Sequence, residues 1–254
     1  MSPASHFSFD GVVEVVAHRG FSARAPENTL SALRLALDTG ADAVEFDLQT
    51  ACDGTPVVLH DETVDRTTNG TGFVGALGLD SLRDLDAGRW FGGAFAGEPL
   101  PTLFDALDLL AGSNTRIYAE IKPGREPAHL RTIAELVRLG GHMERTVFIS
   151  LEWSSLDAIR EHEPRALVGY IVEDAARARA AFERSTGDDR ALLDFDARIL
   201  LADPSLARRA ASAAIPLATW TVDTVEAASQ LLAMGVPRIA TNRVDLLVEW
   251  KRTL

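Results

Sequence analysis

Eight short apolar runs, rich in β-branched and aromatic residues, alternate along the chain with segments of helical periodicity. They lie at residues 13–18, 43–49, 116–121, 146–151, 166–172, 197–203, 216–222 and 238–242. Strands that read as nearly continuous apolar runs are typical of a parallel sheet covered by helices. Eight strand–helix repeats in 254 residues therefore predict an α/β fold with a closed (β/α)8 barrel. The competing prediction, an open doubly wound sheet, lacks a glycine-rich dinucleotide loop after its first strand.

The helical segments carry their own start and stop signals. One is expected to run from a cap at Asn28 to Gly40, and another from Pro127 to Gly140. Helices of this length fit the crossover connections between parallel strands.

One interval is too long for a single helix and its loops. Between "PVVLH" (56–60) and the run that begins at residue 116, the chain is rich in glycine and turn residues, as in "TTNGTG" (67–72). No Lys-Ser/Thr pair ends that stretch, so a phosphate-binding P-loop is not expected. We expect one domain, residues 12–251, with an insertion at about 61–100 that folds over one mouth of the barrel. A helix should follow near Thr102.

Composition narrows the choice of partner. The formal net charge of −12 argues against nucleic acid or an anionic membrane surface as the main partner. The chain has a single cysteine, Cys52, no stretch of transmembrane length, and no basic start followed by an apolar run. We therefore expect a cytoplasmic protein without stable membrane insertion.

The stretch "VEFDLQ" (44–49) places two acids inside an apolar strand. Side chains alternate along a strand, so Glu45 and Asp47 should point to the same face, about 6.6 Å apart. Two charges at that separation repel by about 2.5 kcal/mol at an effective dielectric of about 20. A divalent cation between the two carboxylates would offset this repulsion.

Further polar residues stand near the carboxyl ends of apolar runs, where barrel enzymes build their active sites. They are His18 and Arg19 after the first run, His60 after "PVVL", Glu120 and Lys122 in and after the third, and Trp220 in the seventh. Three carboxylates at this end would form an all-oxygen site that suits Mg²⁺, Ca²⁺ or Mn²⁺.

Simpler interpretations stay open for these residues. Glu120 and Lys122 could form only a buried ion pair, and Trp220 could belong to the core. Glu27 and Asn28 in "PENT" are interpreted as a helix start.

Several motifs in the same order resemble the glycerophosphodiester phosphodiesterase family. They are "VVAHRGFSARAPENTLSAL", "AVEFDLQTACDGTPVVLHDETVDRTTNGTG", "LDAGRWF", "LPTLFDALDLL", "YAEIKPG" and "WTVD", and the match runs from about residue 12 to 250. The resemblance implies a TIM barrel with a small insertion after the second strand. Two positions depart from the usual pattern: Asp223 stands where the family often has Asn, and "TNRVD" (241–245) replaces "TDRPD".

The resemblance also implies roles for the polar residues. One divalent cation, Mg²⁺ or Ca²⁺ with Mn²⁺ as a further candidate, would be bound by Glu45, Asp47 and Glu120. His18 and His60 would form the general acid/base pair, Arg19 and Lys122 would hold the phosphate, and Trp220 would line the substrate pocket. Neither histidine is assigned as the acid or the base at this point.

The expected reaction is hydrolysis of a small glycerophosphodiester to an alcohol and glycerol 3-phosphate. One alternative is phospholipase D-type activity on lysophospholipids or sphingomyelin, which the acidic composition disfavours. The other is a barrel that binds phosphodiesters without catalysis. The His18–His60 pair disfavours this, because binding alone needs no proton-transfer groups.

Overall fold

The computed structural model describes residues 6–9 and 11–254. Residues 1–5 and 10, which belong to the N-terminal segment considered above for a targeting signal, lie outside the described residues.

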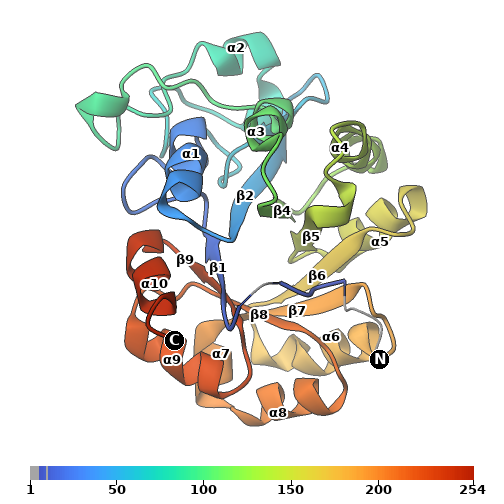
Figure 1. Ribbon diagram of the computed structural model, residues 1–254. Coiled ribbons are helices and arrows are strands. Elements are labelled where there is room, and N and C mark those ends of the chain that lie inside the picture. The colour runs from blue at the N-terminus through green and yellow to red at the C-terminus, as the bar shows by residue number, and fades with distance from the viewer. Residues whose placement is uncertain (1–5, 10) are drawn as a thin grey trace.

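Eight parallel strands form a closed barrel, as predicted (Figure 1). They are β1 (Glu14–Ala17), β2 (Ala43–Thr50), β4 (Arg116–Ile121), β5 (Thr146–Ser150), β6 (Leu167–Val172), β7 (Ala191–Asp196), β8 (Leu217–Trp220) and β9 (Arg238–Thr241). The ring closes where β1 pairs in parallel with both β2 and β9. The remaining strand, β3 (Pro56–Val58), is antiparallel to the end of β2 and lies outside the ring.

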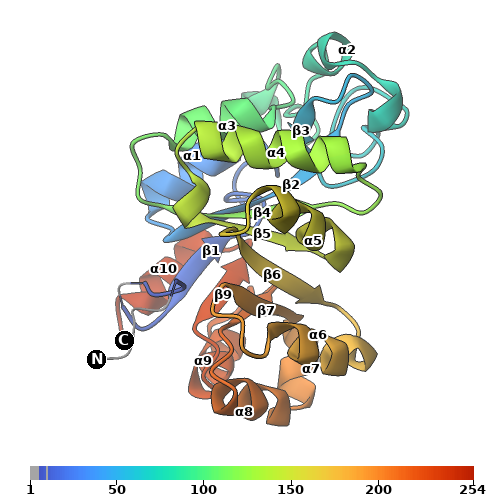
Figure 2. The same cartoon turned by 90° about the vertical axis from the view of Figure 1, so that its right-hand side faces the viewer.

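Helices surround the barrel on its outer side (Figures 1 and 2). They are α1 (Leu30–Thr39), α3 (Leu103–Leu110), α4 (Pro127–Leu139), α5 (Trp153–His162), α6 (Ala178–Ser185), α7 (Ala197–Ala202), α8 (Ser205–Ser212), α9 (Val225–Ala233) and α10 (Val244–Lys251). Short helical turns occur at η3 (Met143–Arg145) and η4 (Ala175–Arg177). No helix in the described part of the chain is both long enough and apolar enough to cross a membrane.

The expected strand at residues 197–203 is wrong. The strand at this place in the barrel is β7, which ends at Asp196, and residues 197–202 form helix α7. Asp196 caps this helix, because its side chain accepts a hydrogen bond from the backbone N–H of Arg198. The apolar residues that suggested a strand belong to this helix. Its buried residues, Ala197 and Leu200, are three positions apart and lie on one helix face.

The cap of the first helix also differs from the expectation. Thr29, not Asn28, is the N-cap of α1, and its side chain accepts from the backbone N–H of Ala32. Asn28 adopts a positive φ of 59° and turns its side chain toward the barrel.

The segment between β3 and α3 packs against the edge of the barrel and holds η1 (Val74–Ala76), α2 (Leu79–Arg83) and η2 (Gly93–Phe95). Figure 1 shows this segment at the top, beyond β2 and α3. Its buried side chains form a small apolar cluster of their own around Val64, Val74 and Leu82. Thr102 then begins α3 through a capping box with Asp105, as expected for a helix near Thr102. The domain limits, residues 12–251 with an insertion at about 61–100, stay a prediction.

The lower part of the barrel interior is filled. Toward the amino ends of the strands, apolar side chains that include Val16, Tyr118 and Leu192 pack against one another inside the ring of strands. Glu14 lies 3.3 Å from Arg116 and 3.2 Å from Arg238 at the amino ends of the strands. The opposite end of the barrel, at the carboxyl ends of the strands, holds the cavity described next.

Candidate active site

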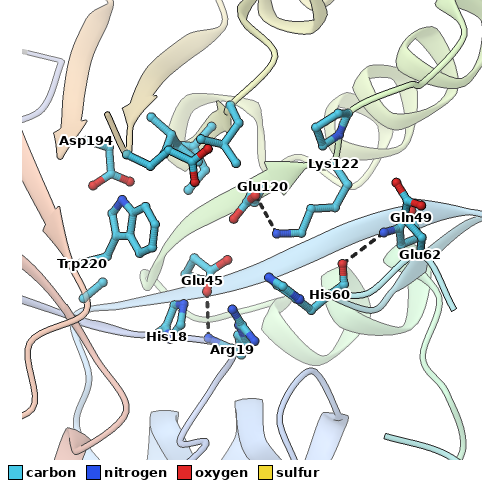
Figure 3. Close-up of a pocket in the computed structure, with 16 residues that line it drawn as sticks. His18, Arg19, Glu45, Gln49, His60, Glu62, Glu120, Lys122, Asp194 and Trp220 are labelled. Carbon is cyan, nitrogen blue, oxygen red and sulfur yellow. Dashed lines mark hydrogen bonds and ion pairs between the residues drawn. The ribbon is translucent and has the colours of Figure 1, made fainter. Parts of the chain in front are cut away.

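A cavity of about 390 Å³ opens at the carboxyl ends of the barrel strands (Figure 3). It brings together seven of the eight predicted site residues, namely His18, Arg19, Glu45, His60, Glu120, Lys122 and Trp220. The eighth, Asp47, is fully buried directly behind this wall and contacts Lys122. A volume of this size fits a small polar molecule.

A tight turn after β1 places His18 and Arg19 at the cavity. Arg19 has a φ of 57° and Gly20 a φ of 76°, both in the left-handed region. A Cβ at Gly20 would come within 2.6 Å of the backbone of Ala32, so only glycine fits there. The turn directs the backbone N–H of Arg19 to Oε2 of Glu45, at 2.8 Å.

Three carboxylates meet on neighbouring strands. Glu45 and Asp47 lie on the same face of β2, and Glu120 on β4 is directly opposite Asp47 in the strand register. One oxygen from each of the three lies within 4.8 Å of the other two. Asn28 donates to Oδ2 of Asp47 at 2.7 Å, which fixes the orientation of that carboxylate.

The three acids perturb one another. Burial, and then the charges of Asp47 and Glu120, raise the pKa of Glu45 well above its usual range. Burial and the charge of Asp47 raise the pKa of Glu120 to about 7. Although burial alone would raise it, Lys122 and Arg19 hold the pKa of Asp47 below its usual range.

This donor set fits a hard divalent cation. Oε1 of Glu45 is buried and has no hydrogen-bond partner among the described residues, so it is free to act as a ligand. The donors are all carboxylate oxygens, the type that Mg²⁺, Ca²⁺ and Mn²⁺ prefer. A bound cation would also relieve the repulsion that raises the pKa of Glu45.

Two basic side chains lie against the acids. Nζ of Lys122 is 2.6 Å from Oε1 of Glu120 and 2.7 Å from Oδ1 of Asp47. Nε of Arg19 is 3.4 Å from Oδ2 of Asp47. When all three carboxylates are ionised, the two cationic groups leave the cluster with one net negative charge.

His18 is held by a polar chain from the loop that follows the neighbouring strand β9. Its Nδ1 lies 2.8 Å from Oδ1 of Asn242, and Nδ2 of Asn242 donates to Asp223 at 2.8 Å. Burial, and then the neighbouring charge of Arg19, lower the pKa of His18 to about 4. His18 is therefore a neutral imidazole at pH 7.

His60 is held in a different way. Its Nδ1 lies 2.6 Å from the carboxylate of Asp61, and Asp61 accepts two hydrogen bonds from Arg66. Arg66 also binds Glu27, which binds Arg19 at 2.9 Å. This chain of charges connects the loops that carry the two imidazoles. Burial lowers the pKa of His60, against the opposing effect of the Asp47 and Asp61 carboxylates.

Sequence reasoning missed several residues of the site. Glu27 and Asn28 were interpreted only as a helix start, yet both bind side chains of the cavity wall. Asp61 and Arg66 were not singled out, although an acid beside His60 was a visible signal. Asp194 lines the cavity from β7 and was overlooked because the strand was expected at 197–203.

The chain resembles known proteins over nearly its whole length. The model of the glycerophosphoryl diester phosphodiesterase family matches residues 18–246. A curated relative, the glycerophosphodiester phosphodiesterase of Caldanaerobacter subterraneus subsp. tengcongensis, is 34% identical over 244 residues, which are 94% of this chain and 97% of the relative.

Solved structures show the same fold. The glycerophosphodiester phosphodiesterase of Agrobacterium tumefaciens has a TM-score of 0.80 and 29% identity, over 93% of this chain and 99% of that one. An Oleispira antarctica phosphodiesterase in complex with the product sn-glycerol-3-phosphate has a TM-score of 0.86 and 27% identity, over 95% and 97%.

Proposed function

This enzyme belongs to the glycerophosphoryl diester phosphodiesterase family, and we propose that it hydrolyses glycerophosphodiesters to an alcohol and glycerol 3-phosphate. The observation that carries the proposal is that two imidazoles, two basic side chains and a cluster of three carboxylates, of which Asp47 is buried behind the wall, meet at one cavity. The Oleispira antarctica phosphodiesterase binds sn-glycerol-3-phosphate as its product, which supports the same product here.

Glu45, Asp47 and Glu120 would hold one divalent cation, Mg²⁺ or Ca²⁺, with Mn²⁺ as a further candidate. When bound, such a cation polarises a phosphoryl oxygen and stabilises the charge that develops in the transition state. Its two positive charges would turn the cluster from one net negative charge to one net positive charge, which suits an anionic diester.

Arg19 and Lys122 orient the phosphate in this proposal. Both basic groups line the cavity, and both are fixed by ion pairs with Asp47. Fixed donors that face the transferring phosphoryl group stabilise its charge without reorganisation at the moment of reaction.

The hydrogen-bond networks suggest different roles for the two imidazoles. Nδ1 of His18 donates to Asn242, so its Nε2 is unprotonated and can accept a proton from the attacking water molecule. His60 has a carboxylate on Nδ1, which stabilises the imidazolium form. We therefore propose His18 as the general base and His60 as the general acid that protonates the leaving alkoxide.

Phospholipase D-type activity and binding without catalysis remain the alternative functions. A cavity of about 390 Å³ is large enough to hold a small diester. Each imidazole has a fixed partner on Nδ1, an arrangement that proton transfer requires and binding alone does not.

The test is a product assay on purified protein. Glycerophosphocholine and lysophosphatidylcholine are incubated with the enzyme in excess chelator, and then with Mg²⁺, Ca²⁺ or Mn²⁺ added, and products are identified by phosphorus NMR. We expect glycerol 3-phosphate and choline from glycerophosphocholine, only with a cation. Faster turnover of lysophosphatidylcholine would favour the phospholipase alternative, and tight binding of both without turnover would favour the binding protein. The cytoplasmic location expected from the sequence stays a prediction.

A further inference from the structure

Besides Oε1 of Glu45 and Nε of Arg19, which belong to the acidic cluster, two more buried polar atoms in the cavity wall have no hydrogen-bond partner among the described residues. They are Oδ1 of Asp194 and Nε1 of Trp220. Asp194 is 6% exposed, so water does not readily solvate its carboxyl group. Buried polar groups are nearly always paired, and an unpaired donor beside an unpaired acceptor indicates a missing ligand.

The donor and the acceptor are neighbours in the barrel. On adjacent strands β7 and β8, Asp194 is opposite Ala218 and Asp196 is opposite Trp220. Asp194 and Trp220 therefore project from the same sheet face, two positions apart along the strands. Figure 3 shows both on the side of the cavity that is away from His60 and Lys122.

The rest of this side of the cavity is mostly apolar. Ile149, Leu151 and Ile171 line it, and none of these side chains can form a hydrogen bond; the exposed Glu173, just after β6, is the one further charged residue among the described residues that line this side. The carboxylate of Glu120 is close enough to act electrostatically on Asp194. A ligand group in this place would thus have a carbon skeleton, at least one polar group, and a position beside the proposed cation site.

We propose that Asp194 and Trp220 bind the hydroxyl groups of the glycerol moiety and so select diesters that contain glycerol. The inference rests on the proposed function and assigns the end of the substrate that this part of the cavity holds. A hydroxyl group both donates and accepts, so it can donate to Asp194 and accept from Nε1 of Trp220. The apolar side chains would contact the carbon atoms of the glycerol.

A cationic alcohol such as choline fits this place less well. A quaternary ammonium group has no acceptor, so it would leave the N–H of Trp220 without a partner. A hydroxyl group can pair with either protonation state of Asp194, because the carboxylate accepts and the neutral acid both donates and accepts.

The test compares two substrates that share the choline leaving group. Glycerophosphocholine has both glycerol hydroxyl groups, and n-propyl phosphocholine has neither. We expect the wild-type kcat/KM to favour glycerophosphocholine by about 10³-fold or more, because a site built for hydroxyl groups rejects an analogue that lacks them. In Asp194→Leu that ratio should fall by about 10²-fold, through loss of activity on glycerophosphocholine alone. Trp220→Phe, which keeps an aromatic ring but removes the N–H, should reduce the ratio in the same direction.

Asp196→Asn is the matched control, because this acid lies on the same strand but outside the cavity, and Asn also caps helices well. It should leave the ratio unchanged. The melting temperature of Asp194→Leu should equal or exceed that of the wild type, because an unpaired buried polar group is removed.

Equal losses of kcat/KM on both substrates in Asp194→Leu would overturn the inference. If the melting temperature of this variant also fell, the result would indicate a structural role for Asp194. Either result leaves the proposed function intact if the wild type hydrolyses glycerophosphocholine. A folded wild type that hydrolyses neither substrate with any cation would instead contradict the proposed function.

Discussion

Oδ1 of Asn242 lies 2.8 Å from Nδ1 of His18, and this contact determines which imidazole nitrogen faces the cavity. Nδ2 of Asn242 must donate to the carboxylate of Asp223, which can only accept, so the amide orientation is set. The amide oxygen then requires a proton on Nδ1 of His18, and Nε2 is left as the acceptor. In the proposed mechanism this network positions the general base.

An exchange of the two partners tests this relationship. In the double variant Asp223→Asn, Asn242→Asp, the amide can still donate to the carboxylate, but a carboxylate now faces His18. A negative partner favours the imidazolium and should raise the pKa of His18 from about 4. His18 acts as the neutral base, so protonation inactivates it. As the pH is lowered, the double variant should therefore lose activity at a higher pH than the wild type, and the acid limb of the kcat/KM profile should shift up by about 1 pH unit or more.

The companion variant is Asn242→Leu, which removes the acceptor and leaves His18 free to rotate. We expect kcat to fall by about 10- to 100-fold with little change in KM, the range seen when partners that orient a catalytic side chain are removed. An unshifted acid limb in the double variant, together with full activity in Asn242→Leu, would show that the network does not act through His18.

The partner of His60 gives an opposite pH effect. Asp61→Asn removes the charge that stabilises the imidazolium, so the pKa of His60 should fall further below its usual value. As the pH is raised, His60 would then lose its proton at a lower pH than in the wild type. The alkaline limb of the pH–rate profile should therefore shift to lower pH. Asp65→Asn is the control, because Asp65 is exposed and its one hydrogen bond to a described residue is accepted from the backbone N–H of Gly72. An alkaline limb that moves equally in both variants would contradict the role of Asp61.

Much of this architecture was predictable because the barrel repeats one simple pattern. Each strand is apolar on both faces, so an acid inside one stands out, as Glu45, Asp47 and Glu120 did. Asp194 was missed for the same reason. Two acids interrupt residues 191–196, whereas residues 199–202 are continuously apolar and give the stronger strand pattern. Only the register of β7 against its neighbours shows that Asp194 points into the cavity.

Long-range polar partners could not be predicted from spacing. Asn242 is 224 positions from His18, and the barrel closure that brings β9 beside β1 unites them. Arg66 reaches Glu27 across 39 positions, through the fold of the segment after β3. Asn28 and Thr29 are adjacent, and both residue types cap helices well. Sequence alone does not separate them, so the cap was assigned to Asn28 although Thr29 occupies that position.

The carboxylate cluster predicts how the enzyme responds to metal. In chelator, Glu45→Gln should melt at a higher temperature than the wild type, because the variant removes one of three repelling buried acids. Added Mg²⁺, Ca²⁺ or Mn²⁺ should raise the melting temperature of the wild type by mass action but leave that of Glu45→Gln nearly unchanged. Glu249→Gln, on the exposed face of α10, is the control and should respond like the wild type. An equal metal response in all three proteins would remove Glu45 from the ligand set.

Lys122 tests the charge at the phosphate. Lys122→Met removes a cationic group that lies within 2.7 Å of both Asp47 and Glu120. We expect kcat/KM for glycerophosphocholine to fall by about 10²-fold or more. Lys251→Met, which breaks an ion pair with Asp42 outside the cavity, should stay within about threefold of the wild type. A loss below twofold in Lys122→Met would leave Lys122 with only a structural role.

The division of work between the two imidazoles is tested most directly by leaving-group dependence. Choline needs protonation as its P–O bond breaks, whereas p-nitrophenolate leaves without it, and general acid catalysis is typically worth about 10²- to 10⁴-fold. We predict that His60→Ala loses about 10²-fold or more on glycerophosphocholine but far less on a p-nitrophenyl phosphodiester, and that His18→Ala loses activity on both. Equal losses on both substrates in His60→Ala would contradict the assignment and leave the histidines as phosphate contacts.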